Sequence, residues 1–251
     1  MSIRLITFDL DDTLWDVAPV MHGAEAALRD WLGEHAPRLG PVPIEHLWAI
    51  RKRVMAEDPS LRHRMSELRR RILLLALQEA GYVPGEARDL AEAAFQIFLS
   101  ARHQVSFFPD VQSTLEQLAN RYILGVLTNG NADVRRLGLA DYFQFALCAE
   151  ELGVGKPDPH PFEQALARAG VPAEQALHVG DHPADDILGA RGAGMHAVWY
   201  NPQGKPWQLP DARPGMLSSG LEGADPKLLQ RCQPSAEIRS LGELPGLLQR
   251  W

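Results

Sequence analysis

The chain has 251 residues, of which 45% are hydrophobic and 23% are charged, the usage of an ordinary globular protein. At roughly 150 residues per domain, this length predicts one large domain or a core with a smaller partner, and it excludes a long solenoid. The formal net charge of −7 argues against a general binder of nucleic acid or of anionic membranes, because such proteins need a cationic surface.

Short apolar runs that end in polar residues predict buried strands. Helical periods lie between them, so the chain alternates strands with single helices, which is typical of an α/β fold with a doubly wound parallel sheet. The strands are expected at 3–8, 122–127, 145–149, 176–179, 196–200 and 236–238, and the helices at 111–119, 132–137, 161–169, 185–193 and 241–248.

The segment 19–105 breaks this alternation, because it carries helical periods and no convincing strand. We expect helices there at 24–32, 44–57, 66–80 and 86–101. The segment is therefore predicted to be an inserted α-helical domain, with residues 1–18 and 106–251 as the core. A stretch rich in Pro and Gly at 203–233 is expected to form an irregular surface excursion.

Cysteine usage and hydropathy predict a cytoplasmic protein. Cys148 and Cys232 are far apart in sequence and form neither a disulfide framework nor a zinc site by themselves. The first twelve residues lack the apolar stretch of a signal peptide, and the longest apolar run, 72–77, is far too short to span a membrane.

In an open parallel sheet, ligands bind beyond the carboxyl ends of the strands. Four polar segments are predicted to lie there: 9–13, 128–130, 155–159 and 180–186. Cleavage of a phosphate monoester needs a nucleophile, a proton donor for the leaving oxygen, and positive charge over the phosphoryl group.

The first segment offers the nucleophile and the acid. Asp9 is the candidate nucleophile, and Asp11 the candidate general acid that then acts as base toward water. Two carboxylates repel a dianionic phosphate, so we expect a hard cation with oxygen ligands, for which Mg²⁺ is suited. Asp181 is the expected third acid.

In type, order and spacing, the four segments resemble the signature motifs of the haloacid dehalogenase (HAD) superfamily of phosphohydrolases. These proteins have a Rossmann-like core, and many carry a helical cap inserted after the first motif. The resemblance implies that Asp9, the backbone carbonyl of Asp11 and Asp181 hold Mg²⁺, with Asp186 in support.

The same resemblance assigns the phosphoryl contacts. Thr128 is expected to donate its hydroxyl and Asn129 its backbone N–H, while Lys156 supplies a cation and tempers the charge of Asp9. Lys156 does not belong to a nucleotide-binding P-loop, because Pro157 stands where that motif needs Ser or Thr.

Each of these residues alone also has an ordinary structural interpretation as a turn or cap residue. Their joint occurrence at successive strand ends favours a phosphotransfer site. Asp12 is expected to cap a turn and Asp185 to be an acid at a helix N-terminus. We expect His178 and His182 not to be metal ligands, with His182 at the edge of the pocket.

The inserted segment carries eight basic residues between 51 and 71 against three acidic ones. They form either a solvated helix face with ion pairs or, notably at His63, Arg69 or Arg71, a surface that reads an anionic substrate. Trp15 is expected in the core, with stacking on a base or flavin ring as the alternative.

Stretches at 8–14, 128–132, 139–143 and 178–181, with the cap pattern 67–71, resemble the bacterial YigB-type phosphatases. This resemblance implies activity on flavin mononucleotide or on the phosphorylated ribitylamino-uracil of riboflavin biosynthesis. The alternatives are a phosphatase of sugar phosphates such as N-acylneuraminate phosphate, a broad-specificity phosphatase, a phosphomutase, and a non-catalytic binding protein.

A 2-haloacid dehalogenase is disfavoured by Asp11, because a halide leaving group needs no proton. The expected partner is a small phosphorylated metabolite, not nucleic acid or membrane, and the chain is expected to be a monomer or homodimer.

Overall fold

The computed structural model describes residues 2–41, 44–208 and 233–251. The chain divides into two compact units. Unit 1 comprises Met1–Asp16, Ser106–Gly130 and Val134–Trp251, and unit 2 comprises Val17–Val105 and Asn131–Asp133. The domain boundaries expected from the sequence, 1–18 with 106–251 and 19–105, remain a prediction, and most of the excursion expected at 203–233 lies outside the described residues.

Unit 1 is built on one six-stranded sheet in which all neighbouring strands are parallel, in the order β3-β2-β1-β4-β5-β6. The strands are β1 (Leu5–Phe8), β2 (Ile123–Thr128), β3 (Phe145–Cys148), β4 (Ala176–Gly180), β5 (His196–Tyr200) and β6 (Ala236–Ile238). The strand order reverses beside β1, so the carboxyl ends of β1 and β4 form the switch point at which such sheets bind ligands. The predicted doubly wound α/β fold is confirmed.

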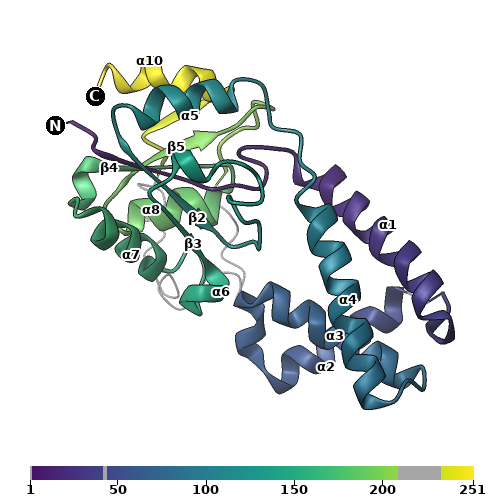
Figure 1. The fold of residues 1–251 in the computed structure, drawn as a ribbon. Coiled ribbons are helices and arrows are strands. Elements are labelled where there is room, and N and C mark those ends of the chain that lie inside the picture. Colours follow the sequence, from purple (N-terminus) through teal and green to yellow (C-terminus); the bar gives the residue numbers. More distant parts are fainter. Residues whose placement is uncertain (1, 42–43, 209–232) are drawn as a thin grey trace. The chain divides into compact units, whose positions relative to one another are not determined.

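The apolar runs form these strands because both faces of the sheet are covered. All four residues of β1 and all five of β4 are buried. Helix α5 (Val111–Ala119) and helix α10 (Leu244–Leu248) cover one face, and α7 (Pro159–Ala169) and α8 (Gly189–Gly192) cover the other (Figure 1). A short helix, α6 (Ala149–Leu152), follows β3.

Two helix predictions in unit 1 need correction. The helix expected at 132–137 is absent: residues 134–138 form turns, and Gly138 has a φ of 70°. A glycine with a left-handed φ ends a helix instead of continuing it, and so short a segment takes its conformation from its surroundings. The helix expected at 185–193 is divided into a π-helical turn, Pro183–Leu188, and α8. Such wide turns are frequent at functional sites.

Unit 2 is helical throughout, and no strand occurs among its described residues. Its helices are α1 (Val17–His35), α2 (Ile44–Glu57), α3 (Met65–Glu79) and α4 (Pro84–Arg102), with 3-10 turns at Pro37–Leu39 and Pro59–His63. Helix α1 begins earlier than expected because Val20 continues the buried stripe of Ala24 and Leu28 at four-residue spacing.

The basic side chains of α3 are paired inside unit 2. Arg69 lies 2.8 Å from Glu25 and stacks over Phe98 with its guanidinium carbon 3.6 Å from the ring centroid. Arg70 forms an equivalent pair with Glu92, at 2.7 Å. Arg71 likewise contacts Glu67 at 3.2 Å and Asp58 at 3.6 Å. For these three residues the structure favours the ion-paired helix face over a surface that reads substrate.

Within the described ranges, no helix combines the length and the apolar character needed to cross a membrane.

Candidate active site

One buried lysine joins two carboxylates at the ends of the central strands. Lys156 Nζ donates to Asp9 Oδ1 at 2.7 Å and to Asp186 Oδ1 at 2.6 Å. The three side chains are 3%, 12% and 1% exposed, respectively. Asp9 directly follows β1, Lys156 precedes α7, and Asp186 lies in the π-helical turn after β4. Hydrogen bonds between charged groups of this kind are short and strong when buried.

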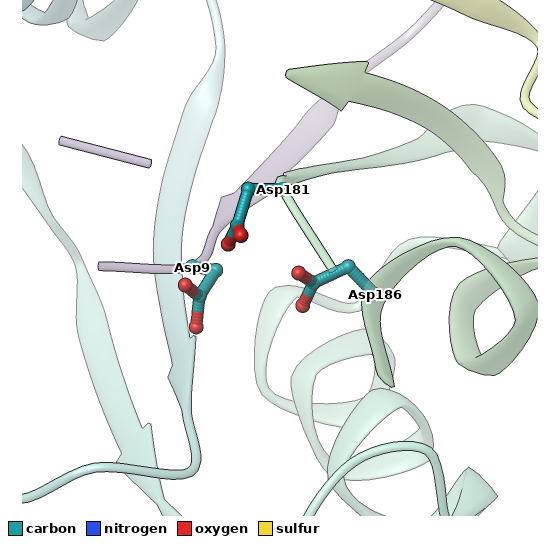
Figure 2. Close-up of side chains that lie close together, drawn as sticks. All are labelled: Asp9, Asp181 and Asp186. Carbon is teal, nitrogen blue, oxygen red and sulfur yellow. The ribbon is translucent and has the colours of Figure 1, made fainter. Parts of the chain in front are cut away.

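A third carboxylate, Asp181, completes an acidic cluster. One oxygen from each of Asp9, Asp181 and Asp186 lies within 4.8 Å of the other two, and Figure 2 shows the three side chains converging. The hydroxyl of Thr13 lies 3.5 Å from Asp9 Oδ2 and 3.4 Å from Asp181 Oδ1. Lys156 offsets the charge of one carboxylate, so the cluster retains an excess of negative charge when all three are ionised.

The pKa values reflect this excess. Burial raises the pKa of Asp9 to about 7; Lys156 opposes the rise, and the neighbouring Asp186 carboxylate adds to it. Burial also raises the pKa of Asp181 to about 8, with further contributions from Asp186 and Asp9. For Asp186 burial acts in the same direction, but Lys156 and His178 outweigh it and hold its pKa well below the usual range.

This donor set fits a hard divalent cation. All three side chains offer oxygen, the ligand atom of Mg²⁺ in proteins, and a cation relieves the repulsion that adds to burial in raising the pKa values of Asp9 and Asp181. Asp186 is already engaged at both oxygens, because Oδ1 contacts Lys156 and His178 while Oδ2 accepts the backbone N–H of His182 at 2.8 Å. Its arrangement is that of a supporting carboxylate.

His178 fixes Asp186 from inside the sheet. Its Nε2 lies 3.1 Å from Asp186 Oδ1 and its Nδ1 2.8 Å from the hydroxyl of Thr7. Burial lowers the pKa of His178, so the neutral ring donates from Nε2 and accepts at Nδ1. This contact was not predicted from the sequence. The sequence feature that could have predicted it is the two-residue spacing of His178 and Gly180. This spacing places both residues on one face of β4, the face against which Asp186 packs.

Gly180 provides the space that Asp186 occupies. A Cβ atom at this glycine would collide with the side-chain carbon and oxygen atoms of Asp186. The close approach of this turn to β4 therefore depends on the absence of a side chain at position 180.

The side chain of Asn129 holds the backbone of Lys156. Its Oδ1 accepts the Lys156 N–H and its Nδ2 donates to the Lys156 carbonyl, both at 2.8 Å. From the sequence, only the backbone N–H of Asn129 was expected to act. Thr128, at the end of β2, is buried, and its hydroxyl accepts the N–H of Gly130 at 3.0 Å.

Asp11 lies at the edge of this group, half-buried, and its Oδ1 accepts a hydrogen bond from the indole N–H of Trp15 at 3.0 Å. Trp15 is fully buried, as the core-packing prediction requires, so it does not stack on a ligand ring. The intervening Asp12 lies in the predicted turn, with a φ of 60°.

The two remaining sequence candidates are turn residues. Asp185 is in the first turn of the π-helical segment, as predicted, and its Oδ2 accepts from Asn129 Nδ2 at 3.3 Å. His182 caps that turn, because its Nδ1 accepts the N–H of Asp185 at 3.1 Å.

Comparison with known proteins matches residues 3–194 to the model of the haloacid dehalogenase-like hydrolase family. The chain is 35% identical over 201 residues to 5-amino-6-(5-phospho-D-ribitylamino)uracil phosphatase YigB of Escherichia coli, covering 80% of this chain and 84% of that protein. It is 34% identical over 251 residues to phosphoserine phosphatase of Thermus thermophilus, covering 87% and 96%.

Among solved structures, the fold superposes with a TM-score of 0.89 on a crystal structure described as 2-haloacid dehalogenase from Pseudomonas syringae pv. Tomato DC3000. The identity is 61%, and the match covers 99% of both chains. The HAD-hydrolase YfnB from Bacillus subtilis, whose structure is described as bound to magnesium, matches with a TM-score of 0.62 over 99% of both chains. At 24% identity, this second likeness concerns the fold alone.

Replacement of Gly180 by Ala tests the close approach of Asp186 to β4. We expect the free energy of unfolding, measured in urea, to fall by about 1–3 kcal/mol, the usual cost of overpacking a buried site. The matched control is Gly192→Ala, where a Cβ meets nothing within 4 Å and stability should hold. Equal effects of the two substitutions contradict the packing described above.

The raised pKa values predict a pH-dependent stabilisation by Mg²⁺. Asp181 and Asp9 bind protons as the pH falls through about 8 and about 7, so the burial of their negative charges, with repulsion from neighbouring carboxylates, destabilises the fold only above this range. Saturation at 100 times Kd adds about 2.7 kcal/mol, or about 5–10 °C in Tm for a chain of this size. We expect this full shift at about pH 8.5 and a clearly smaller one at about pH 6.

Thermal unfolding with MgCl₂, or with NaCl at equal ionic strength, measures this shift. The Asp181→Asn variant should lose most of it at both pH values. If Mg²⁺ raises the Tm of Asp181→Asn as much as that of the parent protein, the metal binds elsewhere. The same conclusion follows if the increase in Tm of the parent protein is equal at both pH values.

Proposed function

The chain belongs to the haloacid dehalogenase-like hydrolase family, and we propose that it is a Mg²⁺-dependent phosphatase that forms an aspartyl-phosphate on Asp9. Its relatives include phosphatases of small phosphorylated metabolites. The observation that carries the proposal is the buried Asp9–Lys156–Asp186 bridge with Asp181 beside it. This arrangement combines a held carboxylate nucleophile, a fixed cation and an acidic cation site.

In this proposal Asp9, Asp181 and the backbone carbonyl of Asp11 hold Mg²⁺, and Asp186 supports them through its hydrogen bonds. When bound, Mg²⁺ offsets the negative charge that the carboxylates and the phosphate share. Lys156 adds a fixed positive charge to the site. Its Nζ lies 2.7 Å from Asp9 Oδ1 and stabilises the ionised form of that carboxylate.

The reaction has two displacements. Asp9 attacks phosphorus, the bond from phosphorus to the leaving oxygen breaks, and Asp11 donates its proton to that oxygen. Asp11 then takes a proton from water as the water oxygen attacks the phosphorus of the aspartyl-phosphate. Inorganic phosphate leaves, and Asp9 regains its carboxylate. Thr128 and the Asn129 N–H bind the phosphoryl oxygens in both steps.

For the substrate we propose a ribityl phosphate, either flavin mononucleotide or the phosphorylated ribitylamino-uracil. Support comes from the 35% identity to YigB of Escherichia coli. The 34% identity to a phosphoserine phosphatase and the 30% identity to a glyceraldehyde 3-phosphate phosphatase of Methanothermobacter thermautotrophicus support a different or broader metabolite range. All of these substrates are phosphate esters of alkyl alcohols, which need a proton donor such as Asp11.

The second candidate function is 2-haloacid dehalogenation, favoured by the 61% identical structure that is described as such an enzyme. There Asp9 would attack carbon and displace halide. This chemistry uses the nucleophile and Lys156 but gives no role to Asp11, an acid held by hydrogen bonding, or to the cluster of three carboxylates. Both features fit phosphate ester cleavage.

Replacement of Asp9 by Asn should abolish phosphate release, because the amide does not form the acyl-phosphate. The control is Asp141→Asn, an exposed aspartate in a 3-10 turn of the same unit. Phosphate release from p-nitrophenyl phosphate with Mg²⁺ measures the effect. Turnover within about tenfold of the parent protein in Asp9→Asn contradicts the aspartyl-phosphate mechanism.

A substrate panel separates the candidate functions. We expect selective phosphate release from flavin mononucleotide in the presence of Mg²⁺ and its loss with EDTA. Activity spread over sugar phosphates or phosphoserine keeps the mechanism and rejects the ribityl substrate. Halide release from 2-chloropropionate, with no phosphate release from any ester, rejects the phosphatase proposal and supports dehalogenation.

A further inference from the structure

We propose that Trp15 is a positioning residue that orients Asp11, the general acid, through the hydrogen bond from its indole N–H. The inference rests on the proposed phosphatase function and extends it to a residue outside the four polar segments. The donor and acceptor atoms, Trp15 Nε1 and Asp11 Oδ1, are 3.0 Å apart.

The backbone after β1 turns back on itself and brings the two residues together. The N–H of Leu14 donates to the carbonyl of Leu10, and that of Asp12 donates to the carbonyl of Trp15, both at 2.8 Å. Asp11 and Trp15 consequently pair as an isolated bridge. The left-handed conformation of Asp12, with a φ of 60°, makes this tight return possible.

The indole has little freedom to move away from Asp11. Trp15 is fully buried, and its ring packs edge-on against Phe107 with centroids 6.0 Å apart and planes at 64°. Loss of the acceptor would leave a buried N–H donor without this bond, at a cost of about 1–3 kcal/mol. Rotations of Asp11 that break the bond are therefore disfavoured.

The bond also favours one position of the proton on Asp11. A neutral carboxylic acid has one O–H, and its carbonyl oxygen is the stronger acceptor, so the indole N–H favours the acid form in which Oδ1 is the carbonyl oxygen. With Oδ1 facing Trp15, the transferable proton is assigned to Oδ2. The indole also donates to the carboxylate form, and more strongly because that acceptor is charged, so the same anchor holds Asp11 when it acts as acid and when it acts as base.

Leaving-group dependence separates this role from simple packing. In Trp15→Phe, which keeps an aromatic ring and removes the N–H, we expect kcat for glycerol 2-phosphate to fall about tenfold or more, because general acid catalysis contributes about 10²–10⁴-fold. For p-nitrophenyl phosphate, whose leaving group needs little protonation, kcat should stay within about twofold. The matched control is Phe107→Leu, which loosens the same packing but keeps the donor.

A second replacement removes only the donor. β-(3-Benzothienyl)alanine at position 15 has the shape of tryptophan with sulfur in place of the N–H, so it should reproduce the leaving-group effect even where Trp15→Phe fails to fold. The hydrogen bond itself is visible in ¹H–¹⁵N spectra of the six tryptophans. Asp11→Asn should shift the Trp15 indole resonance most, because it replaces the carboxyl group that accepts this hydrogen bond with an amide.

Equal losses for both esters in an active enzyme, in either Trp15 replacement, overturn the positioning role and leave the proposed function intact. An unshifted indole resonance in Asp11→Asn overturns it as well. A parent protein that releases phosphate from neither of these esters nor from flavin mononucleotide overturns the phosphatase function, and the role of Trp15 with it.

Discussion

The site depends on one ammonium group, that of Lys156, held between the largely buried carboxylates of Asp9 and Asp186. Such a cation is stable only when its partners are held at short distance, and several features of unit 1 serve this requirement. Asn129 fixes the backbone of Lys156 through two hydrogen bonds, the π-helical turn carries Asp186 against Gly180, and His178 fixes the carboxylate from the sheet. Asp181 then adds negative charge that the lysine does not balance, so the same constraint that orders the site also produces an acidic cluster suited to a cation.

Much of the fold follows from local sequence signals. The strands were predictable because uncharged runs such as 123–128 and 176–180 are buried on both faces, and Asp9 and Asp181 were predictable because they directly follow such runs. The turn at 134–138 and the π-helical turn were not, because a short segment takes its conformation from tertiary packing. The contacts of Thr7 with His178 and of Asn129 with Lys156 join distant parts of the chain, and only the folded sheet brings them together.

Unit 2 shows a related limit on inference from charge. The segment 51–71 has a net positive charge, whereas the chain as a whole is negatively charged. This difference made the segment a candidate for recognising an anion. Two of its partners come from other helices: Glu25 of α1 pairs with Arg69, and Glu92 of α4 pairs with Arg70. A local charge count does not include these two acids, because only the fold brings them next to α3. Arg69, Arg70 and Arg71 are thus engaged within unit 2, while a role of His63 in reading an anionic substrate stays a prediction.

The central place of β1 has a consequence for biosynthesis. This strand is made first, yet its two neighbours are β2 and β4, and Leu5 pairs with Ile123 and Ala176. At about 5–20 residues per second, the ribosome needs several seconds to tens of seconds to supply both partners. During this interval the helices of α1 to α4 are complete, whereas β1 remains an exposed apolar segment, of the kind that chaperones bind. Asp9, the proposed nucleophile, directly follows this strand and is thus made well before the segments that complete its surroundings.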